Sequence, residues 1–231
     1  MVEAYELLVE KLREIEGGLV HKNKGESDIT TSCGIYRGAH PNAGVFTYID
    51  QLAMAIGISK PSSQWTRVEL DAINNHIDRD IENSYSVEFY KDYFSKVVDI
   101  NKLPNELIWP FYNIYVNGNK LAGKALQYSC NLMLKKYPKL FNPSGDKNEL
   151  NVDGLIGNGT RSLLYSISEI VKFLPQGDVY GEIWKQYFLQ RCKTEYVMIG
   201  TTDVSKTGTD KDIKFLRGWI NRCDALLEET L

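Results

Sequence analysis

The chain has 231 residues and a formal net charge of -3, with 43% apolar and 25% charged residues. This composition is ordinary for a globular protein that can bury a core, and it gives no global basic field for nucleic acid or an anionic membrane. No segment approaches the roughly 20 apolar residues of a transmembrane helix. The first residues carry acids and no continuous apolar run, so we expect no signal peptide. The four cysteines are widely spaced and indicate neither a zinc site nor a dense disulfide framework.

The predicted elements are mostly helices. Apolar residues at helical spacing predict a first helix, which Gly17 and Gly18 end. Residues 19–40 are polar and glycine-bearing, and they predict an irregular loop or a short hairpin. Further helices are expected at 46–57, 64–80, 85–98, 105–117, 119–136, 159–174, 178–197 and 211–228. Polar loops are expected at 137–153 and 200–210. The predicted fold class is mainly α, with one small β-hairpin allowed after the first helix.

Glu16 stands at an unusual place in this pattern. It follows Leu12 by four residues and Leu8 by eight, so it continues the apolar face of the first helix. A carboxylate on that face is partly desolvated, and it also lies at the negative end of the helix dipole. Both effects raise the pKa of a carboxyl group, and a general acid has to hold a proton near neutral pH. The sequence therefore makes Glu16 a candidate general acid, the alternative being a helix-end glutamate in solvent.

The segment after Glu16 carries a resemblance to a known family. A helix ending in Glu-Gly-Gly (16–18), a polar loop, and then Thr-Ser-Cys-Gly-Ile (31–35) resembles the muramidases of glycoside hydrolase family 108, which have a lysozyme-like fold. The resemblance implies that Glu16 is the catalytic acid and that Thr31, across the cleft, helps to position water. A second carboxylate would stand in the loop, where both Glu26 and Asp28 are candidates. The family usually has an Asp and two glycines before the Thr, whereas this loop reads GESDIT (25–30) and is one residue longer.

The second half resembles the predicted peptidoglycan domain that accompanies this enzyme family. The resemblance lies in FYNIYVNGNKLAGKALQ (111–127), LNVDGLIGNGTRSLL (150–164) and FLRGWINR (215–222). Its matching residues are Asn117, Gly118, Leu126, Gln127, Asp153, Gly154, Gly157 and Thr160. Asn113 stands where the family usually has Asp. We therefore expect a lysozyme-like catalytic region at 1–100 and a helical peptidoglycan-binding region at 101–231, packed together as one unit, with a break near Asn101–Pro104.

The resemblance implies a lysozyme-type peptidoglycan hydrolase, an N-acetylmuramidase that cleaves the β-1,4 bond between N-acetylmuramic acid and N-acetylglucosamine. No metal or cofactor is expected. Tyr36, Arg37, His40 and Asn117 are candidate substrate-binding residues. Two alternatives stay open: a lytic transglycosylase with the same acid, and a non-catalytic wall-binding or secretion-accessory module.

The expected partner is the peptidoglycan glycan strand, with no nucleic acid and no membrane insertion. Proteins of this type include phage lysis enzymes (endolysins) and muramidases that assist protein secretion. We expect synthesis in the cytoplasm and action on the cell wall after lysis or export, with a holin or an export machinery delivering the protein.

Overall fold

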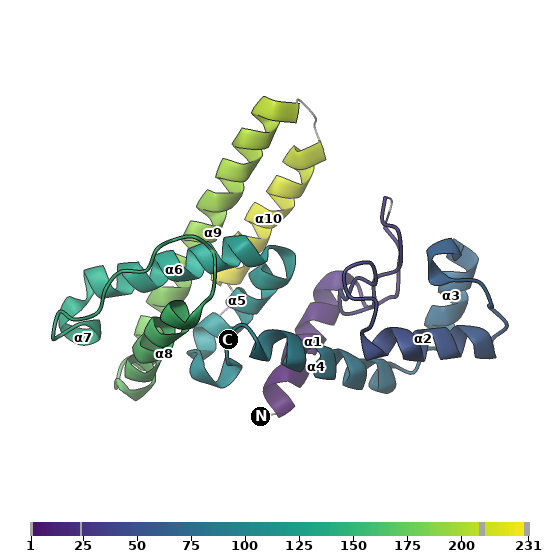
Figure 1. Ribbon diagram of the computed structural model, residues 1–231, viewed down its shortest axis with the longest axis horizontal. Coiled ribbons are helices and arrows are strands. Elements are labelled where there is room, and N and C mark those ends of the chain that lie inside the picture. The colour runs from purple at the N-terminus through teal and green to yellow at the C-terminus, as the bar shows by residue number, and fades with distance from the viewer. Residues whose placement is uncertain (1, 24, 208–210, 229–231) are drawn as a thin grey trace. The chain divides into compact units, whose positions relative to one another are not determined.

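The computed structural model describes residues 2–23, 25–207 and 211–228, and the chain divides into two compact units, Met1–Val97 and Val98–Leu231. The fold is mainly α-helical (Figure 1), which confirms the predicted class. The described residues contain no β-strand; in place of a hairpin, isolated antiparallel bridges join His21 to Thr30 and Thr30 to Tyr36. No helix in these ranges has the length and apolar character needed to span a membrane.

The first unit consists of α1 (Val2–Glu16), α2 (Gly44–Ala55), the short 3-10 turn η1 (Ser62–Gln64), α3 (Arg67–His76) and α4 (Arg79–Ser95). Helix α4 packs against α1 and α2, and α2 packs against α3. The core between these helices contains the fully buried side chains of Leu12, Phe46, Ile49, Ile73 and Phe94. Removing such apolar surface from water is the main force that holds the helices together.

The expected single helix over 64–80 was wrong, because the structure forms two helices there. A capping box starts α3: the Thr66 hydroxyl accepts a hydrogen bond from the Glu69 N–H, and the Glu69 carboxylate accepts one from the Thr66 N–H. Asp78 then caps α4 by accepting hydrogen bonds from the N–H groups of Asp80 and Ile81. Helix α3 ends at His76 and the Asp78 cap starts a new helix, in a region where the apolar spacing alone is continuous.

The second unit contains the 3-10 turn η2 (Ile100–Lys102), followed by α5 (Asn105–Asn117), α6 (Asn119–Lys136), α7 (Pro138–Phe141), α8 (Asn158–Phe173), α9 (Gly177–Thr207) and α10 (Lys211–Glu228). The bounds of α5 and α6 agree with the prediction. Helices α5, α6, α8 and α10 all pack against α9, so α9 is the central helix of this unit (Figure 1). Its Trp184 and Phe188 are fully buried, as is Phe111 of α5.

The expected loop at 200–210 was also wrong as far as residue 207, since α9 continues to Thr207. Residues 208–210 lie outside the described residues. The prediction rested on polar composition, which disfavours a helix only weakly. The expected loop at 137–153 likewise contains one short helix, α7.

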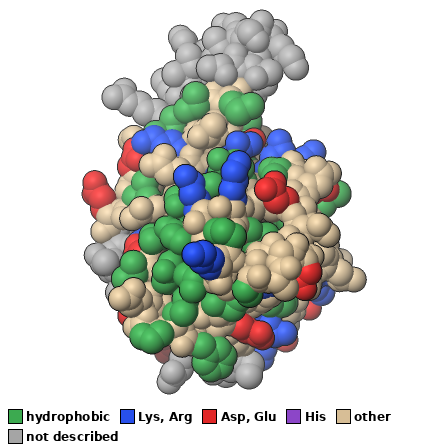
Figure 2. All heavy atoms as spheres, turned by 90° about the vertical axis from the view of Figure 1, so that its left-hand side faces the viewer, with side chains coloured by type: hydrophobic (Ala, Val, Ile, Leu, Met, Phe, Trp, Pro, Cys, Tyr) green, Lys and Arg blue, Asp and Glu red, His purple; other side chains and the backbone are tan. Residues whose placement is uncertain are grey.

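Figure 2 views the molecule from the side on which α7 and α8 lie in Figure 1, and there apolar side chains are mixed with Lys and Arg side chains. The second unit contributes exposed apolar residues, among them Leu155, Phe173 and Val179. Helix α6 contributes four lysines and no acid: Lys120, Lys124, Lys135 and Lys136. Lys124 pairs with the Glu195 carboxylate of α9 at 3.5 Å, so α6 carries a positive charge that this acid partly offsets.

Candidate active site

Glu16 is the last residue of α1, and its side chain is partly exposed. The chain turns at once, because Gly17 and Gly18 adopt φ values of 87° and 66°, a left-handed conformation that favours glycine. The N–H of Gly18 donates to the carbonyl oxygen of Arg13 at 3.0 Å, which closes the end of the helix. The two glycines thus end α1 at Glu16 and redirect the chain into the loop that follows.

Gly34, in the Thr-Ser-Cys-Gly-Ile segment, lies against the Glu16 side chain. A Cβ atom added to Gly34 would be 3.1 Å from Cγ and 3.3 Å from Cδ of Glu16. The φ of Gly34 is also 81°, so this position favours glycine for both space and conformation. The structure therefore brings the two segments of the predicted catalytic block into contact.

Two side chains of α4 hold the turn that carries Gly34. The carboxylate of Glu82 accepts a hydrogen bond from the Ser32 N–H at 3.1 Å. The hydroxyl of Tyr90 donates to the Cys33 carbonyl oxygen at 2.7 Å. Both side chains are buried, so these hydrogen bonds are shielded from water. Helix α4 thereby fixes the position of Gly34 against Glu16.

Sequence reasoning missed Glu82 and Tyr90. Glu82, Ser86, Tyr90 and Phe94 follow one another at four-residue spacing and are all buried. The same spacing argument that singled out Glu16 could have found Glu82, since an acid at a buried helical position needs a partner. Its second carboxylate oxygen pairs with Arg79 at 2.8 Å.

The Glu16 carboxylate affects the pKa of the Tyr90 phenol. Burial raises the pKa of the Tyr90 phenol well above its ordinary value, and the Cys33 thiol and the Glu16 carboxylate add smaller effects in the same direction. Tyr90 therefore stays protonated and remains a hydrogen-bond donor to the turn.

The Glu16 carboxylate itself is unpaired in the described part of the chain, where no hydrogen bond or ion pair to it is found. A general acid has to reach the leaving oxygen of its substrate, so its carboxyl group cannot be fully occupied by the protein. Partial exposure and the lack of a described partner meet that requirement.

Thr31 lies in the interior of this turn and is fully buried. Its hydroxyl accepts a hydrogen bond from the Ile35 N–H at 3.0 Å, and its own N–H donates to the Ile35 carbonyl oxygen at 3.0 Å. In this arrangement Thr31 shapes the turn that presents Gly34 to Glu16. The positioning of water by its hydroxyl stays a prediction.

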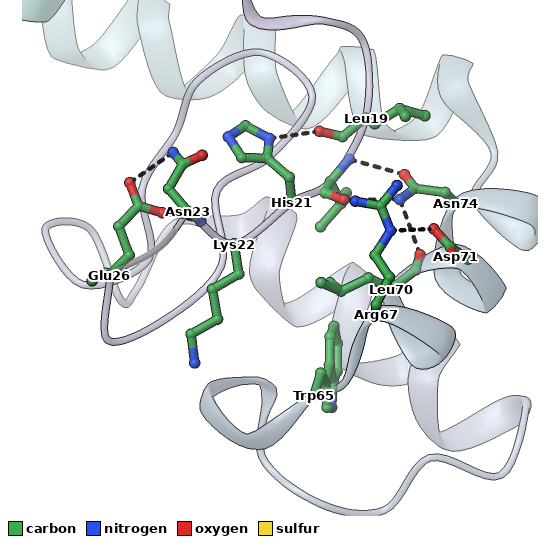
Figure 3. A pocket seen from close by; sticks show the side chains of 12 residues that line it. Leu19, His21, Lys22, Asn23, Glu26, Trp65, Arg67, Leu70, Asp71 and Asn74 are labelled. Carbon is green, nitrogen blue, oxygen red and sulfur yellow. Dashed lines mark hydrogen bonds and ion pairs between the residues drawn. The ribbon is translucent and has the colours of Figure 1, made fainter. Parts of the chain in front are cut away.

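Glu26 lines a pocket of about 380 Å³ between the loop after α1 and helix α3 (Figure 3). Its carboxylate accepts hydrogen bonds from the N–H and the side-chain amide of Asn23, both at 3.0 Å. Trp65 and Leu70 supply apolar surface in this pocket. Such a mixture of aromatic surface and polar groups is common in small-molecule sites.

Asp28 lines a second pocket, of about 510 Å³, which shares Trp65 with the first. Its carboxylate accepts a hydrogen bond from the Ser62 hydroxyl at 2.5 Å and another from the Ile29 N–H at 2.8 Å. Glu16 lines neither pocket. The two candidates for the second carboxylate thus lie in separate pockets, and neither shares its pocket with the candidate acid.

Arg37, a predicted substrate-binding residue, is held by the protein. Its guanidinium forms a two-pronged ion pair with Asp50 and donates to the Ser62 hydroxyl at 2.8 Å. The hydrogen bond to Asp50 is the main cause that raises the pKa of Arg37. Because Ser62 in turn donates to Asp28, Arg37 and Asp28 belong to one network that ties the loop to α2.

The other predicted binding residues lie in different surroundings. The Tyr36 hydroxyl hydrogen-bonds the Ser27 hydroxyl at 2.8 Å. The His40 ring makes edge contacts with Phe89 and Tyr93, at centroid distances of 5.0 and 5.6 Å, and burial lowers its pKa. Asn117 is exposed at the end of α5, in the second unit, where its amide donates to the carbonyl oxygen of Asn113.

Four of the matching residues, Gln127, Asp153, Gly154 and Thr160, form a hydrogen-bonded cluster around Gln127 of α6. Its amide nitrogen donates to the Asp153 carboxylate at 2.9 Å, to the Leu155 carbonyl oxygen at 3.0 Å and to the Thr160 hydroxyl at 3.2 Å. Its amide oxygen accepts from the Gly154 N–H at 2.8 Å. The cluster fastens the segment before α8 to α6, which gives these residues a structural role.

Within the described ranges, no three His, Cys, Asp or Glu side chains are grouped so that they could hold a metal ion. No family model matches the chain, and comparisons with curated proteins and with solved structures found no match either. The chemistry of the site therefore has to be argued from its own residues.

Proposed function

We propose that this protein is a peptidoglycan hydrolase, an N-acetylmuramidase in which Glu16 is the general acid. The observation that carries the proposal is the Glu16 carboxylate, partly exposed at the end of α1, with Gly34 of the second signature segment against it. The resemblance of both segments to glycoside hydrolase family 108, and of the second half to its peptidoglycan domain, supports the same function.

In this mechanism Glu16 protonates the glycosidic oxygen between N-acetylmuramic acid and N-acetylglucosamine as the bond to the anomeric carbon breaks. Water then adds to the anomeric carbon and gives up a proton, so the net reaction is hydrolysis. Glu82 and Tyr90 act as positioning residues, since they hold the turn that borders the acid. Asp28 and Glu26 remain the two candidates for a carboxylate that assists the water.

A lytic transglycosylase is a second candidate, and one observation favours it. Neither Glu26 nor Asp28 shares a pocket with Glu16, and both already accept hydrogen bonds from the protein. A transglycosylase needs the same acid but no carboxylate that activates water, because a hydroxyl of the muramic acid itself attacks and an anhydro sugar forms.

The decisive experiment compares wild type with Glu16→Gln on purified sacculi, by turbidity clearing and by release of reducing ends. We expect Glu16→Gln to lower the rate by roughly 100-fold or more, which is the usual contribution of a general acid. Glu14→Gln is the matched control, because Glu14 is exposed on the same helix and should leave the rate unchanged.

Undiminished clearing by Glu16→Gln would refute the assignment of the acid. Mass spectrometry of the released muropeptides then distinguishes the two reactions, since hydrolysis gives reducing muramic acid and transglycosylation gives the anhydro form. Binding of wild type to sacculi with no release of either product would identify a non-catalytic wall-binding protein instead.

A further inference from the structure

Helices α9 and α10 pack side by side in opposite directions (Figure 1), and two contacts define how they are aligned. The rings of Tyr196 and Trp219 lie 5.0 Å apart between centroids. The Lys193 ammonium pairs with the Asp224 carboxylate at 2.7 Å. As the number on α9 rises from 193 to 196, the number on α10 falls from 224 to 219, which is the mark of an antiparallel pair.

This alignment places Cys192 opposite Cys223. Cys192 lies four residues before Tyr196, and Cys223 lies four residues after Trp219, so both are one helical turn from that aromatic pair in the same direction. Leu189 and Leu226 lie three residues further along. Spacings of three and four residues on each helix are typical of the core positions of a coiled coil.

The burial of these side chains agrees with a core layer that α9 and α10 share. Both cysteines are free thiols with no exposed surface, and Leu189 and Leu226 of the adjoining layer are also buried. Cys223 is one of the causes that raise the pKa of Cys192, and both thiols act on Tyr196, which places all three groups close together. A disulfide needs two side chains that point toward each other across a short gap, and a common core layer provides that orientation.

We propose that Cys192 and Cys223 form an intramolecular disulfide that joins α9 to α10 when the protein meets a disulfide oxidant. One thiolate attacks the oxidant disulfide and releases one of its sulfurs as a thiol. The second thiolate then attacks the mixed disulfide and releases the other. The two cysteines lose two protons and two electrons, and the oxidant disulfide becomes two thiols.

The same burial makes the reaction slow in the folded protein. Burial raises the pKa of Cys192 well above its ordinary value and that of Cys223 to about 12, so little thiolate exists at neutral pH. The bond therefore forms during folding, or when the two helices separate. In an oxidising compartment the disulfide joins α9 to α10, and in a reducing compartment the two thiols stay free. This inference does not depend on the proposed function, because it is tested without a cell-wall substrate.

The test refolds the full chain from urea in a buffer of oxidised and reduced glutathione and maps its peptides by mass spectrometry without reduction. We expect one linked peptide that contains Cys192 and Cys223, and a thermal midpoint roughly 5 °C above that of the reduced protein. Cys192→Ala and Cys223→Ala should each abolish that increase, whereas Cys130→Ala, at a buried cysteine of α6, should keep it.

The linked peptide is measured in the wild type, so the proposal can be judged even if a variant fails to fold. Refolded wild type with both thiols free at a high ratio of oxidised to reduced glutathione would overturn the proposal. Glutathione bound to only one of the two cysteines, or linkage between two chains, would overturn it as well. Fast oxidation of the folded protein, without prior unfolding, would contradict the protection that burial provides.

Discussion

At the scale of single residues, Gly34 meets two different requirements for glycine, one conformational and one steric. Gly34 has a φ of 81°, which penalises any residue with a Cβ, and a Cβ there would lie 3.1 Å from Cγ of Glu16, so the Glu16 side chain would have to shift. Gly57, in the same unit, has a φ of 86° but no atom within 4 Å of an added Cβ. The two glycines therefore share the conformational constraint, and only Gly34 has the steric one.

We predict that Gly34→Ala and Gly57→Ala each lower the free energy of unfolding by about 1–2 kcal/mol, the cost of a left-handed residue with a Cβ. Only Gly34→Ala should also lower the rate of glycan cleavage, by roughly 10- to 100-fold, because it displaces the Glu16 side chain. Urea unfolding and turbidity clearing of sacculi measure the two effects. Equal rates of glycan cleavage for the two variants would mean that Gly34 does not affect the reaction.

The sequence singled out Glu16 and the segment at 31–35, because both stand out in short-range patterns. The role of Glu16 as an acid stays a prediction. Glu82 and Tyr90 were not predicted as partners of that segment. They bind residues 50 and 57 positions earlier in the chain, and such pairings arise only when α4 packs against the turn at 31–35. Spacing along one helix can indicate that a side chain is buried, but it does not name the group that the side chain meets.

At the scale of elements, helix bounds were predictable where apolar spacing and end signals agree, as for α5 and α6. They were missed where a local hydrogen bond begins a new helix, or where the prediction rested on polar composition alone. The Asp78 cap starts α4 within one apolar stretch, so that the stretch forms two helices, and α9 continues through a polar segment to Thr207.

We predict that Gln127→Ala lowers the free energy of unfolding by roughly 2–4 kcal/mol, because it leaves the Gly154 N–H without its partner and removes the amide that donates to the Asp153 carboxylate. Gln186→Ala, at an exposed position on α9, should change it by less than about 0.5 kcal/mol. Urea unfolding compares the two. A loss as small as that of the control would mean that the cluster does not fasten α8 to α6.

Gln127→Ala should also change how the stability of the protein depends on pH. The hydrogen bond from Gln127 is the main cause that lowers the pKa of Asp153, followed by the Leu155 N–H. A carboxyl pKa that is lower in the folded state stabilises the fold above the unfolded-state pKa, and this contribution is lost as the pH falls through the folded-state pKa. In Gln127→Ala the Asp153 pKa, followed by NMR, should therefore rise toward its ordinary value. The part of the free energy of unfolding that Asp153 contributes, and that acidification removes, should become smaller accordingly.

At the scale of the whole molecule, each unit has a core of its own, with Phe46 and Phe94 in the first and Phe111 and Trp184 in the second. The proposed function places cleavage in the first unit and wall binding in the second, and a separate core for each unit is compatible with these two tasks. The lysine-rich, acid-free α6 fits the second task, because peptide stems of the cell wall carry carboxylates.

We predict that replacing Lys135 and Lys136 by Gln weakens the binding of the full chain to sacculi by roughly 3- to 10-fold at low salt, since two exposed positive charges are lost. The comparison uses a Glu16→Gln background, so that the sacculi are not consumed. The matched control replaces Lys91 and Lys96, two exposed lysines of the first unit, and should bind as the parent does. Co-sedimentation at 50 and 300 mM salt measures binding, and the difference should disappear at the higher concentration, where roughly 6 Å of screening length remains. Equal losses from both pairs would mean that net charge, and not α6, attracts the wall.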